Sequence, residues 1–228
     1  MGITVGNFTF TDQDYADDAV LLGDDPGKWT QILTQFDTAC QTMGLHTSWS
    51  KTCLQNTGYG PPPHAVSVQG NTVEVTDRFT YLGSDISSCG RTTPEMFRRI
   101  GLGSSIMNQL ACVWRQSRLS LSTKLRLYNA LVVSVLLYGA ETWTLVKSDE
   151  QKLEAFQMSC LRWILGLRWF DFVSNTSVMN QTQQQSICSR ISSRRHSVFG
   201  HVRCLCESVP AHEALRLAVD TCRSLTGQ

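Results

Sequence analysis

The stretch FTFTDQDYADDAVLL, residues 8–22, decides how this chain begins to fold. Strand-forming residues stand on both sides of the tetrapeptide Tyr15-Ala16-Asp17-Asp18. Two such runs joined by a short polar turn are typical of a β-hairpin. The turn would present two adjacent carboxylates, Asp17 and Asp18, and carboxylate oxygens are the ligands that Mg²⁺ prefers in proteins.

Further hairpin signals lie on either side of this stretch. Gly6-Asn7 separates two short strand-forming runs, and Gly70-Asn71 separates Val66–Val68 from residues 73–75. Both dipeptides favour the tight turns that match the twist of paired strands. Residues 79–82 are a candidate third strand beside the second of these hairpins. The first 90 residues therefore predict small antiparallel sheets.

Helical patterns make up most of the remainder. Asp24-Asp25-Pro26 is a start signal, and apolar residues at helical spacing from Trp29 to Met43 predict a helix that Gly44 ends. Ser148-Asp149-Glu150-Gln151 matches the capping box that opens a helix. Further helices are predicted at residues 93–116, where Gly101 and Gly103 weaken the middle, and at 122–139, 148–166, 175–182 and 186–204.

The charge of the chain is divided unevenly along its length. Residues 1–90 carry three Lys/Arg against ten Asp/Glu, a net charge of −7, whereas residues 91–228 carry seventeen against nine, a net charge of +8. A basic block of this kind indicates an anionic partner such as nucleic acid, or else solvated helix faces rich in arginine. The longest apolar run, residues 130–138, is too short to span a bilayer, so we expect no membrane segment. The amino-terminal residues are not typical of a secretory signal either.

Several motifs, in order, resemble the reverse transcriptases of non-LTR (LINE-type) retrotransposons. The segment Phe8 to Leu22 looks like their metal-binding motif, and residues 44–52, with Lys51, look like the motif that follows it. Phe79-Thr80-Tyr81-Leu82-Gly83 resembles the primer-grip hairpin. Three later stretches resemble the thumb and the segment after it: residues 127–143, 160–166 and 194–212.

This resemblance implies a fold, a reaction and its site residues. The fold would be α+β: a partial antiparallel palm with hairpins at residues 1–90, a helical thumb-like bundle at 91–170 and a helical downstream segment at 171–228. The reaction would extend a DNA primer on an RNA template, with deoxynucleoside triphosphates as substrates and Mg²⁺ or Mn²⁺ as cofactor. Asp17 and Asp18 would bind metal, and Lys51 would protonate the pyrophosphate. The primer grip would comprise Phe79, Tyr81, Leu82 and Gly83, and phosphates would be contacted by Arg98, Arg99, Arg115, Arg118, Arg126 and Arg162.

The chain also departs from the pattern of this family. The first catalytic aspartate and the fingers would lie ahead of Met1, and Ser48 stands where asparagine is frequent. We therefore expect that the isolated chain binds metal weakly and is inactive. We also expect it to be located inside the cell, in the cytoplasm and nucleus. Two alternatives are a non-catalytic nucleic-acid-binding remnant that uses its basic helices, and an unstable product of a decayed element.

Two other residue groups admit a functional or a structural interpretation. Cys204, Cys206, His212 and Cys222, with His201 ahead of them, are zinc-ligand types, but their spacing lacks the paired Cys-x₂₋₄-Cys arrangement of structural sites, so zinc is disfavoured. Cys40 and Cys160 lie on apolar faces and are expected to be buried as small apolar side chains. Core packing is likewise expected, in preference to base stacking, for Trp114, Trp143, Trp163 and Trp169.

Overall fold

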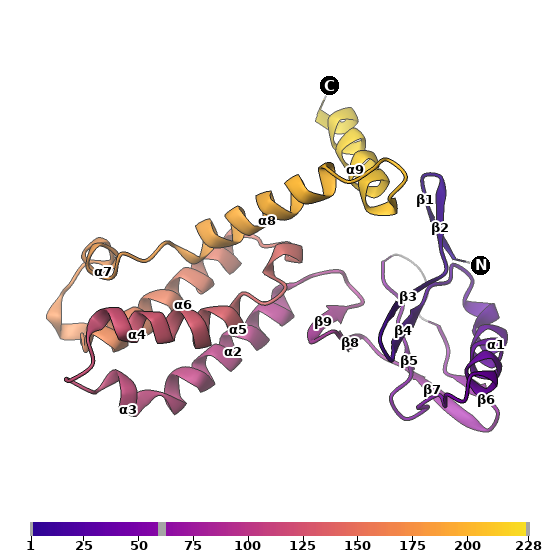
Figure 1. The fold of residues 1–228 in the computed structure, drawn as a ribbon, viewed down its shortest axis with the longest axis horizontal. Helices are drawn as coiled ribbons and strands as arrows, with labels where there is room; N and C mark the ends of the chain where they lie inside the picture. The colour runs from indigo at the N-terminus through magenta and orange to yellow at the C-terminus, as the bar shows by residue number, and fades with distance from the viewer. Residues whose placement is uncertain (1, 59–62, 227–228) are drawn as a thin grey trace. The chain divides into compact units, whose positions relative to one another are not determined.

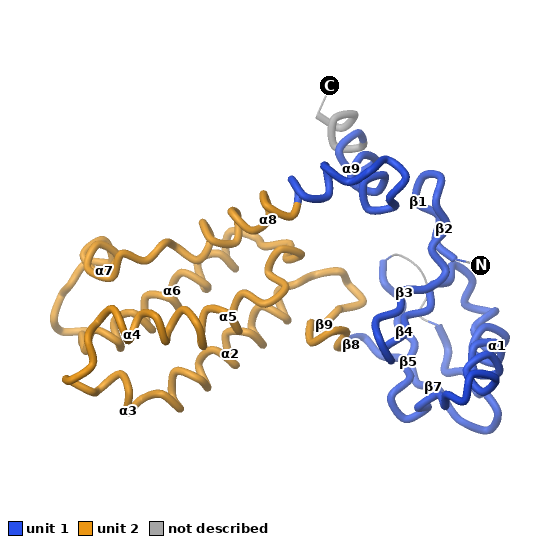
Figure 2. The backbone as a smooth tube through the Cα atoms, viewed as in Figure 1, with its two compact units in different colours: residues 1–79, 199–228 blue, residues 80–198 orange. Residues whose placement is uncertain are grey.

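The structure is a computed structural model that describes residues 2–58 and 63–226. The chain divides into two compact units (Figure 1, Figure 2). Unit 1 comprises Met1–Phe79 and Phe199–Gln228, and unit 2 comprises Thr80–Val198. Unit 1 holds most of the strands and unit 2 most of the helices, so the predicted α+β class is confirmed.

Unit 1 opens with two hairpins. Strand β1 (Ile3–Val5) pairs antiparallel with β2 (Phe8–Phe10), and Val5 stands opposite Phe8, so that Gly6-Asn7 forms the turn. Strand β3 (Asp12–Tyr15) pairs in the same way with β4 (Asp18–Leu21). Both hairpins predicted from the sequence are therefore confirmed.

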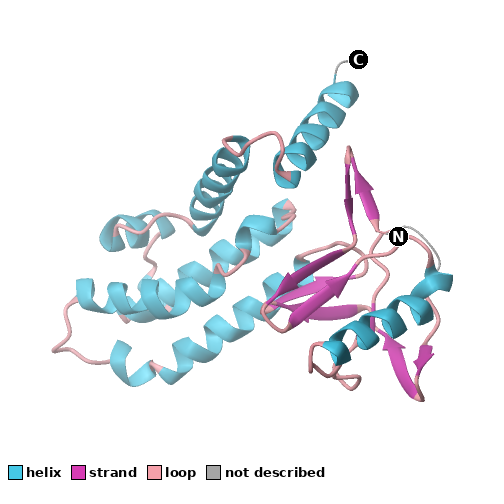
Figure 3. Cartoon of the chain, turned by 45° about the vertical axis from the view of Figure 1, so that its right-hand side comes forward, coloured by secondary structure: helices cyan, strands magenta, loops and turns pink. Residues whose placement is uncertain are grey.

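A small three-stranded sheet and one helix form the core of unit 1. The sheet has the order β5 (Cys53–Leu54), β7 (Asn71–Val75), β6 (Val66–Val68), and β5 runs parallel to β7. Helix α1 (Trp29–Thr42) packs against β6 (Figure 3), and the short 3₁₀ helix η1 (Pro26–Lys28) precedes it. As predicted, Asp25 caps this start, because its Oδ1 accepts a hydrogen bond from the Gly27 backbone N–H at 2.9 Å. The buried centre consists of Leu33, Leu54, Val68 and Val73.

The third strand of this sheet is not the one that the sequence predicts. Strand β8 (Arg78–Tyr81) pairs with β9 (Ser84–Ser87) as a separate two-stranded hairpin, and the third position beside β7 is taken by β5. The expectation that residues 79–82 add to the earlier hairpin was therefore wrong. Strand-forming composition identifies a strand, but its partner is set by turn geometry and tertiary packing.

The helix α9 (Pro210–Thr226) also belongs to unit 1 and lies against the β1–β2 turn. Gly6 has φ +59°, and a Cβ added there would stand only 2.6 Å from Glu213 Oε1 and 3.0 Å from Leu217 Cδ1. Glycine is therefore needed at this turn for two reasons, a left-handed backbone and close contact with a helix.

Unit 2 is built on helices. They are α2 (Thr93–Gln109), α3 (Ala111–Trp114), α4 (Leu121–Leu127), the π-helical segment η2 (Tyr128–Val133), α5 (Ser134–Leu136), α6 (Lys147–Leu165), α7 (Asn175–Thr182) and the part of α8 (Ile187–Arg203) up to residue 198. Two 3₁₀ turns, η3 (Ala140–Thr142) and η4 (Trp169–Asp171), connect them. Among the described residues, no helix combines the length and apolar composition needed to cross a membrane.

The core of unit 2 runs along these helices and buries most of the residues predicted to lie inside. Trp114 and Trp143 are 2% and 3% exposed, and Cys160 is buried among them. Burial raises the pKa of the Cys160 thiol to about 12. Trp169 is different, because it is 86% exposed, and its assignment to the core was wrong.

The helix boundaries differ from the predicted ones at two places. The helix predicted at residues 93–116 is interrupted at Leu110, between α2 and α3. Helix α6 begins at Lys147 with Val146 as its N-cap, so Ser148 does not form the predicted capping box. Asp149 is instead 1% exposed and accepts a hydrogen bond from the Thr93 hydroxyl at 2.9 Å. A contact to another helix has replaced the local cap.

Helix α2 continues through both of the glycines that were expected to weaken it. A Cβ on Gly101 would meet nothing within 4 Å. A Cβ on Gly103 would stand 3.1 Å from Cζ of Phe156 and 3.6 Å from Cγ1 of Val132. Gly103 therefore permits close packing inside the bundle, whereas Gly101 has no such role.

The π-helical segment η2 joins α4 to α5 without a break in the helical path. Its extra residue per turn shifts the phase of the side chains that follow. Tyr128, Val132 and Leu136 are each 0% exposed, and the next residues, Val133 and Leu137, are also buried. This segment therefore turns pairs of consecutive side chains toward the core.

Candidate functional site

The candidate metal-binding turn lies at the tip of the β3–β4 hairpin in unit 1. Tyr15 stands directly opposite Asp18, so Ala16 and Asp17 are the two turn residues. The hairpin continues at its other end with a 2.8 Å hydrogen bond from the Leu22 backbone N–H to the Thr11 carbonyl. The sequence signal for a tight turn that presents two neighbouring aspartates is therefore matched by the backbone.

The turn carries backbone strain. Ala16 has φ +55°, in the left-handed region that L-residues other than glycine, asparagine and aspartate rarely adopt. Such residues cost about 1–3 kcal/mol and cluster at functional sites. The strain follows from placing two central residues between a paired Tyr15 and Asp18, because the turns that fit a two-residue hairpin need a positive φ.

The carboxylates of Asp17 and Asp18 are exposed, and their chemistry fits one Mg²⁺ ion. Asp14 cannot join them directly, because it stands opposite Ala19 and alternation along a strand turns its side chain to the other face from Asp18. No group of three or more metal-binding side chains occurs among the residues whose side chains the structure describes. The described residues therefore offer two carboxylates at this turn, too few to hold the metal pair of a polymerase.

Lys51 also belongs to unit 1. It lies in a turn closed by hydrogen bonds from the backbone N–H groups of Lys51 and Thr52 to the Ser48 carbonyl, at 2.9 and 3.1 Å. Its side chain is exposed, and within the described chain no ion pair joins it to Asp17 or Asp18. Its assignment as a proton donor stays a prediction.

The predicted primer-grip residues form the β8–β9 hairpin. Phe79 and Tyr81 belong to β8, and Leu82 and Gly83 form the turn with φ of +48° and +77°. Two consecutive positive φ values are typical of the mirror-image turn that suits a tight hairpin. Leu82 pays a steric penalty there that a glycine would not.

Three side chains of unit 2 hold this turn through its backbone carbonyls. Arg98 and Arg99 both donate to the Gly83 carbonyl, at 2.7 and 2.5 Å, and the Tyr138 hydroxyl donates to the Leu82 carbonyl at 2.9 Å. The guanidinium of Arg99 also lies over the Tyr138 ring, 4.6 Å from its centroid. Both carbonyls of the strained turn are therefore fixed by the helical part of the chain.

Glu95 organises these arginines. Its carboxylate is 2% exposed and accepts hydrogen bonds from Nε and a terminal nitrogen of Arg98, at 2.6 and 2.8 Å, and from Nε of Arg99 at 2.7 Å. Hydrogen bonding to this carboxylate raises the pKa of Arg98 above its usual value. It also accepts from the Asp85 backbone N–H in β9 at 3.3 Å. Arg98 and Arg99 thus have a structural role that the charge pattern did not predict, and their contact with phosphates stays a prediction.

The other predicted phosphate-binding arginines differ in their surroundings. Arg115, Arg118 and Arg126 are exposed, and no ion pair to them occurs in the part of the chain that the structure describes. Arg162 is half-buried and donates to the Val173 carbonyl at 2.6 Å and to Asn175 Oδ1 at 2.9 Å. Arg115, Arg118 and Arg126 can therefore contact an anion without breaking an ion pair within the described residues. Arg162 is already hydrogen-bonded to the segment that follows α6.

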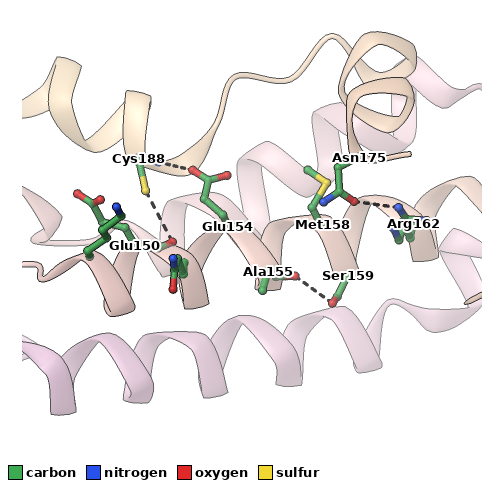
Figure 4. A pocket seen from close by; sticks show the side chains of 10 residues that line it. Glu150, Glu154, Ala155, Met158, Ser159, Arg162, Asn175 and Cys188 are labelled. Carbon is green, nitrogen blue, oxygen red and sulfur yellow. Dashed lines mark hydrogen bonds between the residues drawn. The ribbon is translucent and has the colours of Figure 1, made fainter. Parts of the chain in front are cut away.

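A groove of about 630 Å³ follows one face of α6 in unit 2 (Figure 4). Glu150, Glu154 and Cys188 line one end, where the Cys188 backbone N–H donates to Glu154 Oε1 at 2.9 Å. Arg162 and Asn175 line the other end. Burial and the neighbouring glutamates raise the pKa of the Cys188 thiol to about 12, so it is a poor nucleophile at neutral pH. Cys188 is therefore not a candidate nucleophile of this groove.

The zinc alternative concerns residues near the end of the chain. Cys204, Cys206 and His201 are exposed, and they form no metal-binding group with other described residues. The side chain of Cys222 lies outside the described residues.

Comparison with known proteins finds a distant relative. No family model matches the chain, and no solved structure matches it. The chain is similar to an uncharacterized transposon-derived protein of Caenorhabditis elegans, with 25% identity over 166 residues, which is 72% of this chain and 59% of the relative. This similarity suggests a transposon origin. The matched region spans less than two thirds of the relative's length.

Sequence reasoning missed two residues of the site, Glu95 and Tyr138. Glu95 stands three and four residues ahead of Arg98 and Arg99, the spacing at which helical side chains meet, so an ion pair could have been expected. Tyr138 lies 56 residues from its partner Leu82, and no local pattern reveals such a contact.

Proposed function

We propose that this chain is part of an RNA-directed DNA polymerase of a LINE-type retrotransposon. The observation that carries the proposal is the β3–β4 turn, where a strained backbone at Ala16 presents Asp17 and Asp18 side by side and exposed. A transposon origin is consistent with it. In the complete enzyme, Mg²⁺ at this turn supplies charge neutralisation for the transferred phosphate.

The residues of this chain have distinct tasks in that reaction. Asp17 and Asp18 provide oxygen ligands for one ion, and Lys51 offers a proton to the departing pyrophosphate. The β8–β9 turn at Leu82 and Gly83 seats the primer terminus. Nucleotidyl transfer also needs a further carboxylate that the described residues do not bring to the hairpin, so the chain alone is inactive or nearly so.

Metal binding tests the proposal directly. Mn²⁺ titration of the full chain, followed by electron paramagnetic resonance, should show a weak site that the double change Asp17→Asn with Asp18→Asn weakens by at least about tenfold. The matched control is Asp24→Asn with Asp25→Asn, because Asp24-Asp25 is also an adjacent aspartate pair of unit 1. If both double variants lose the same Mn²⁺ affinity, the β3–β4 turn has no special role in metal binding.

Primer extension tests the reaction class. Oligo(dT) annealed to poly(rA) is incubated with the full chain, dTTP and Mg²⁺ or Mn²⁺. Any incorporation should vanish in the Asp17→Asn, Asp18→Asn variant and persist in the Asp24→Asn, Asp25→Asn control. Incorporation that survives the first double change would refute the assignment of these residues.

A second candidate function is nucleic-acid binding without catalysis. It is favoured by the charge of residues 80–198, where fourteen Lys/Arg against seven Asp/Glu give a net charge of +7. It is also favoured by the exposed arginines Arg115, Arg118 and Arg126, which form no ion pair with any other described residue. Binding of this kind weakens steeply with salt, because each neutralised phosphate releases counterions. An affinity for oligonucleotides that does not change with salt would exclude it.

A further inference from the structure

Three aromatic side chains stand in the solvent between α6 and α7. Trp169 is 86% exposed, Phe172 88% and Phe170 48%. Large aromatic side chains are normally at least half-buried, because each one buries much apolar area on folding. Three such rings within four consecutive residues therefore call for an explanation other than stability.

The backbone that carries these rings is fixed. The Arg168 backbone N–H donates to Asp171 Oδ2 at 2.6 Å, and the Asp171 N–H donates to the Arg168 carbonyl at 3.1 Å. Arg162 holds the Val173 carbonyl at 2.6 Å. Phe172 has φ +48°, a strained conformation for a bulky residue, which persists only where the surroundings impose it. The rings are therefore displayed by a constrained loop.

The charge around the loop is favourable for an anion. The Arg168 guanidinium lies over the Phe170 ring, 5.8 Å from its centroid, and residues 80–198 carry a net charge of +7. The connection between α3 and α4, which contains the exposed Arg118, lies at the same end of the bundle as the loop (Figure 1). Phosphates that reach the rings would meet guanidinium groups.

We propose that Trp169, Phe170 and Phe172 form a stacking platform for the bases of single-stranded nucleic acid. Exposed aromatic faces stack on every base without regard to sequence, while neighbouring arginines contact the phosphates. The inference rests on the proposed function in taking nucleic acid as the partner. A protein partner fits less well, because the core of a protein interface is a continuous apolar patch, whereas the segment that carries these rings also exposes the polar residues Arg168, Asp171 and Ser174.

Oligonucleotide binding by the full chain tests the platform. A fluorescent oligo(rU) of about 12 nucleotides, within the usual site size, is titrated in EDTA without nucleotides, so the result is independent of metal binding at Asp17 and Asp18. Trp169→Ala and Phe172→Ala should each weaken binding by about 5- to 150-fold. Trp169→Phe, which keeps an aromatic face, should retain most of the affinity. Phe199→Ala is the control, because Phe199 is 44% exposed on another element, α8.

The salt dependence and a crosslinking experiment complete the test. Loss of a stacked ring should lower the affinity at every salt concentration and leave the slope of log affinity against log salt unchanged, since no phosphate contact is removed. In the unmodified chain, photocrosslinking to a 4-thiouridine oligonucleotide should label residues 168–173. Unchanged affinity in both alanine variants, or crosslinks confined to other segments, would overturn the platform. So would a loss of self-association in sedimentation with unchanged oligonucleotide affinity, because the rings would then join copies of the chain.

Discussion

Replacing Glu95 with alanine should destabilise unit 2 strongly. The carboxylate is 2% exposed, and the change would leave the Arg99 guanidinium, whose side chain is 7% exposed, without its ionic partner. Removing one member of a buried ion pair costs about 3–5 kcal/mol, because the remaining charge stays desolvated. Arg98, whose side chain is 31% exposed, can turn toward water and should add little. We therefore expect a loss of about 3–5 kcal/mol in the free energy of unfolding.

Urea unfolding of the full chain, followed by far-ultraviolet circular dichroism, measures this loss. The control is Lys28→Ala, which removes one partner of an exposed ion pair with a similar separation of 3.0 Å between Lys28 Nζ and Asp25 Oδ2. Its unfolding midpoint should stay close to that of the unmodified chain.

A double change isolates the ion pair itself. Each single change, Glu95→Ala or Arg99→Met, leaves the charge of the other residue without this partner. The double variant removes both charges of the pair, so it should lose less stability than the two single changes added together. If Glu95→Ala shifts the midpoint no more than Lys28→Ala does, the cluster of Glu95 and its arginines does not stabilise the fold.

Further predictions concern individual residues of both units. Ala16→Gly should raise the free energy of opening of the β3–β4 hairpin, measured by amide hydrogen exchange, by up to about 1 kcal/mol. The reason is that glycine relieves the left-handed strain at this position. Gly101→Ala should raise the free energy of unfolding by about 1 kcal/mol. Gly103→Ala, in the same helix, should lower the free energy of unfolding, because overpacking against Phe156 costs about 1–3 kcal/mol and outweighs the gain in helix propensity. Equal effects at the two glycines would contradict the close packing at Gly103. Thiol labelling at mildly alkaline pH, read by mass spectrometry, should modify Cys89 well before Cys160. Hydrogen bonds lower the pKa of the Cys89 thiol, whereas burial raises that of Cys160. Reaction in the reverse order would show that Cys160 is not buried. Because the folded state raises the pKa of Cys160 to about 12 from 9.0, stability should fall as pH rises across that interval.

The sequence predicts those elements whose causes are local. Gly6-Asn7 specifies the β1–β2 turn and Asp25 specifies the start of η1, because the turn conformation and the cap depend on neighbouring residues alone. The adjacency of Asp17 and Asp18 at a hairpin tip could be predicted for the same reason.

Features set by distant contacts could not be predicted. Asp149 looks like part of a capping box but is drawn into a contact with Thr93, 56 residues away, and the helix starts earlier. The turn at Gly83 depends on arginines that composition assigns to the surface. Trp169 follows the apolar residues at the end of α6, so its sequence position resembles that of a core residue. It is exposed because of the direction that the chain takes after α6. Tertiary packing overrides local propensity in each case.

The π-helical segment η2 also sets where this chain can change in length. It holds one residue more than an ordinary α-helix needs for the same turn, so a one-residue deletion within Tyr128–Val133 would restore an α-helix with an unbroken path. The residues that follow would face nearly the same way as before, with Leu136 and Leu137 in the core and the Tyr138 hydroxyl directed at the Leu82 carbonyl. The same deletion within the α-helix α6 has no extra residue to remove, and it would rotate the residues that follow by about 100° about the helix axis, one residue's step of the 3.6-residue turn. A copy of this chain shortened by one residue at η2 should therefore keep the β8–β9 turn in place.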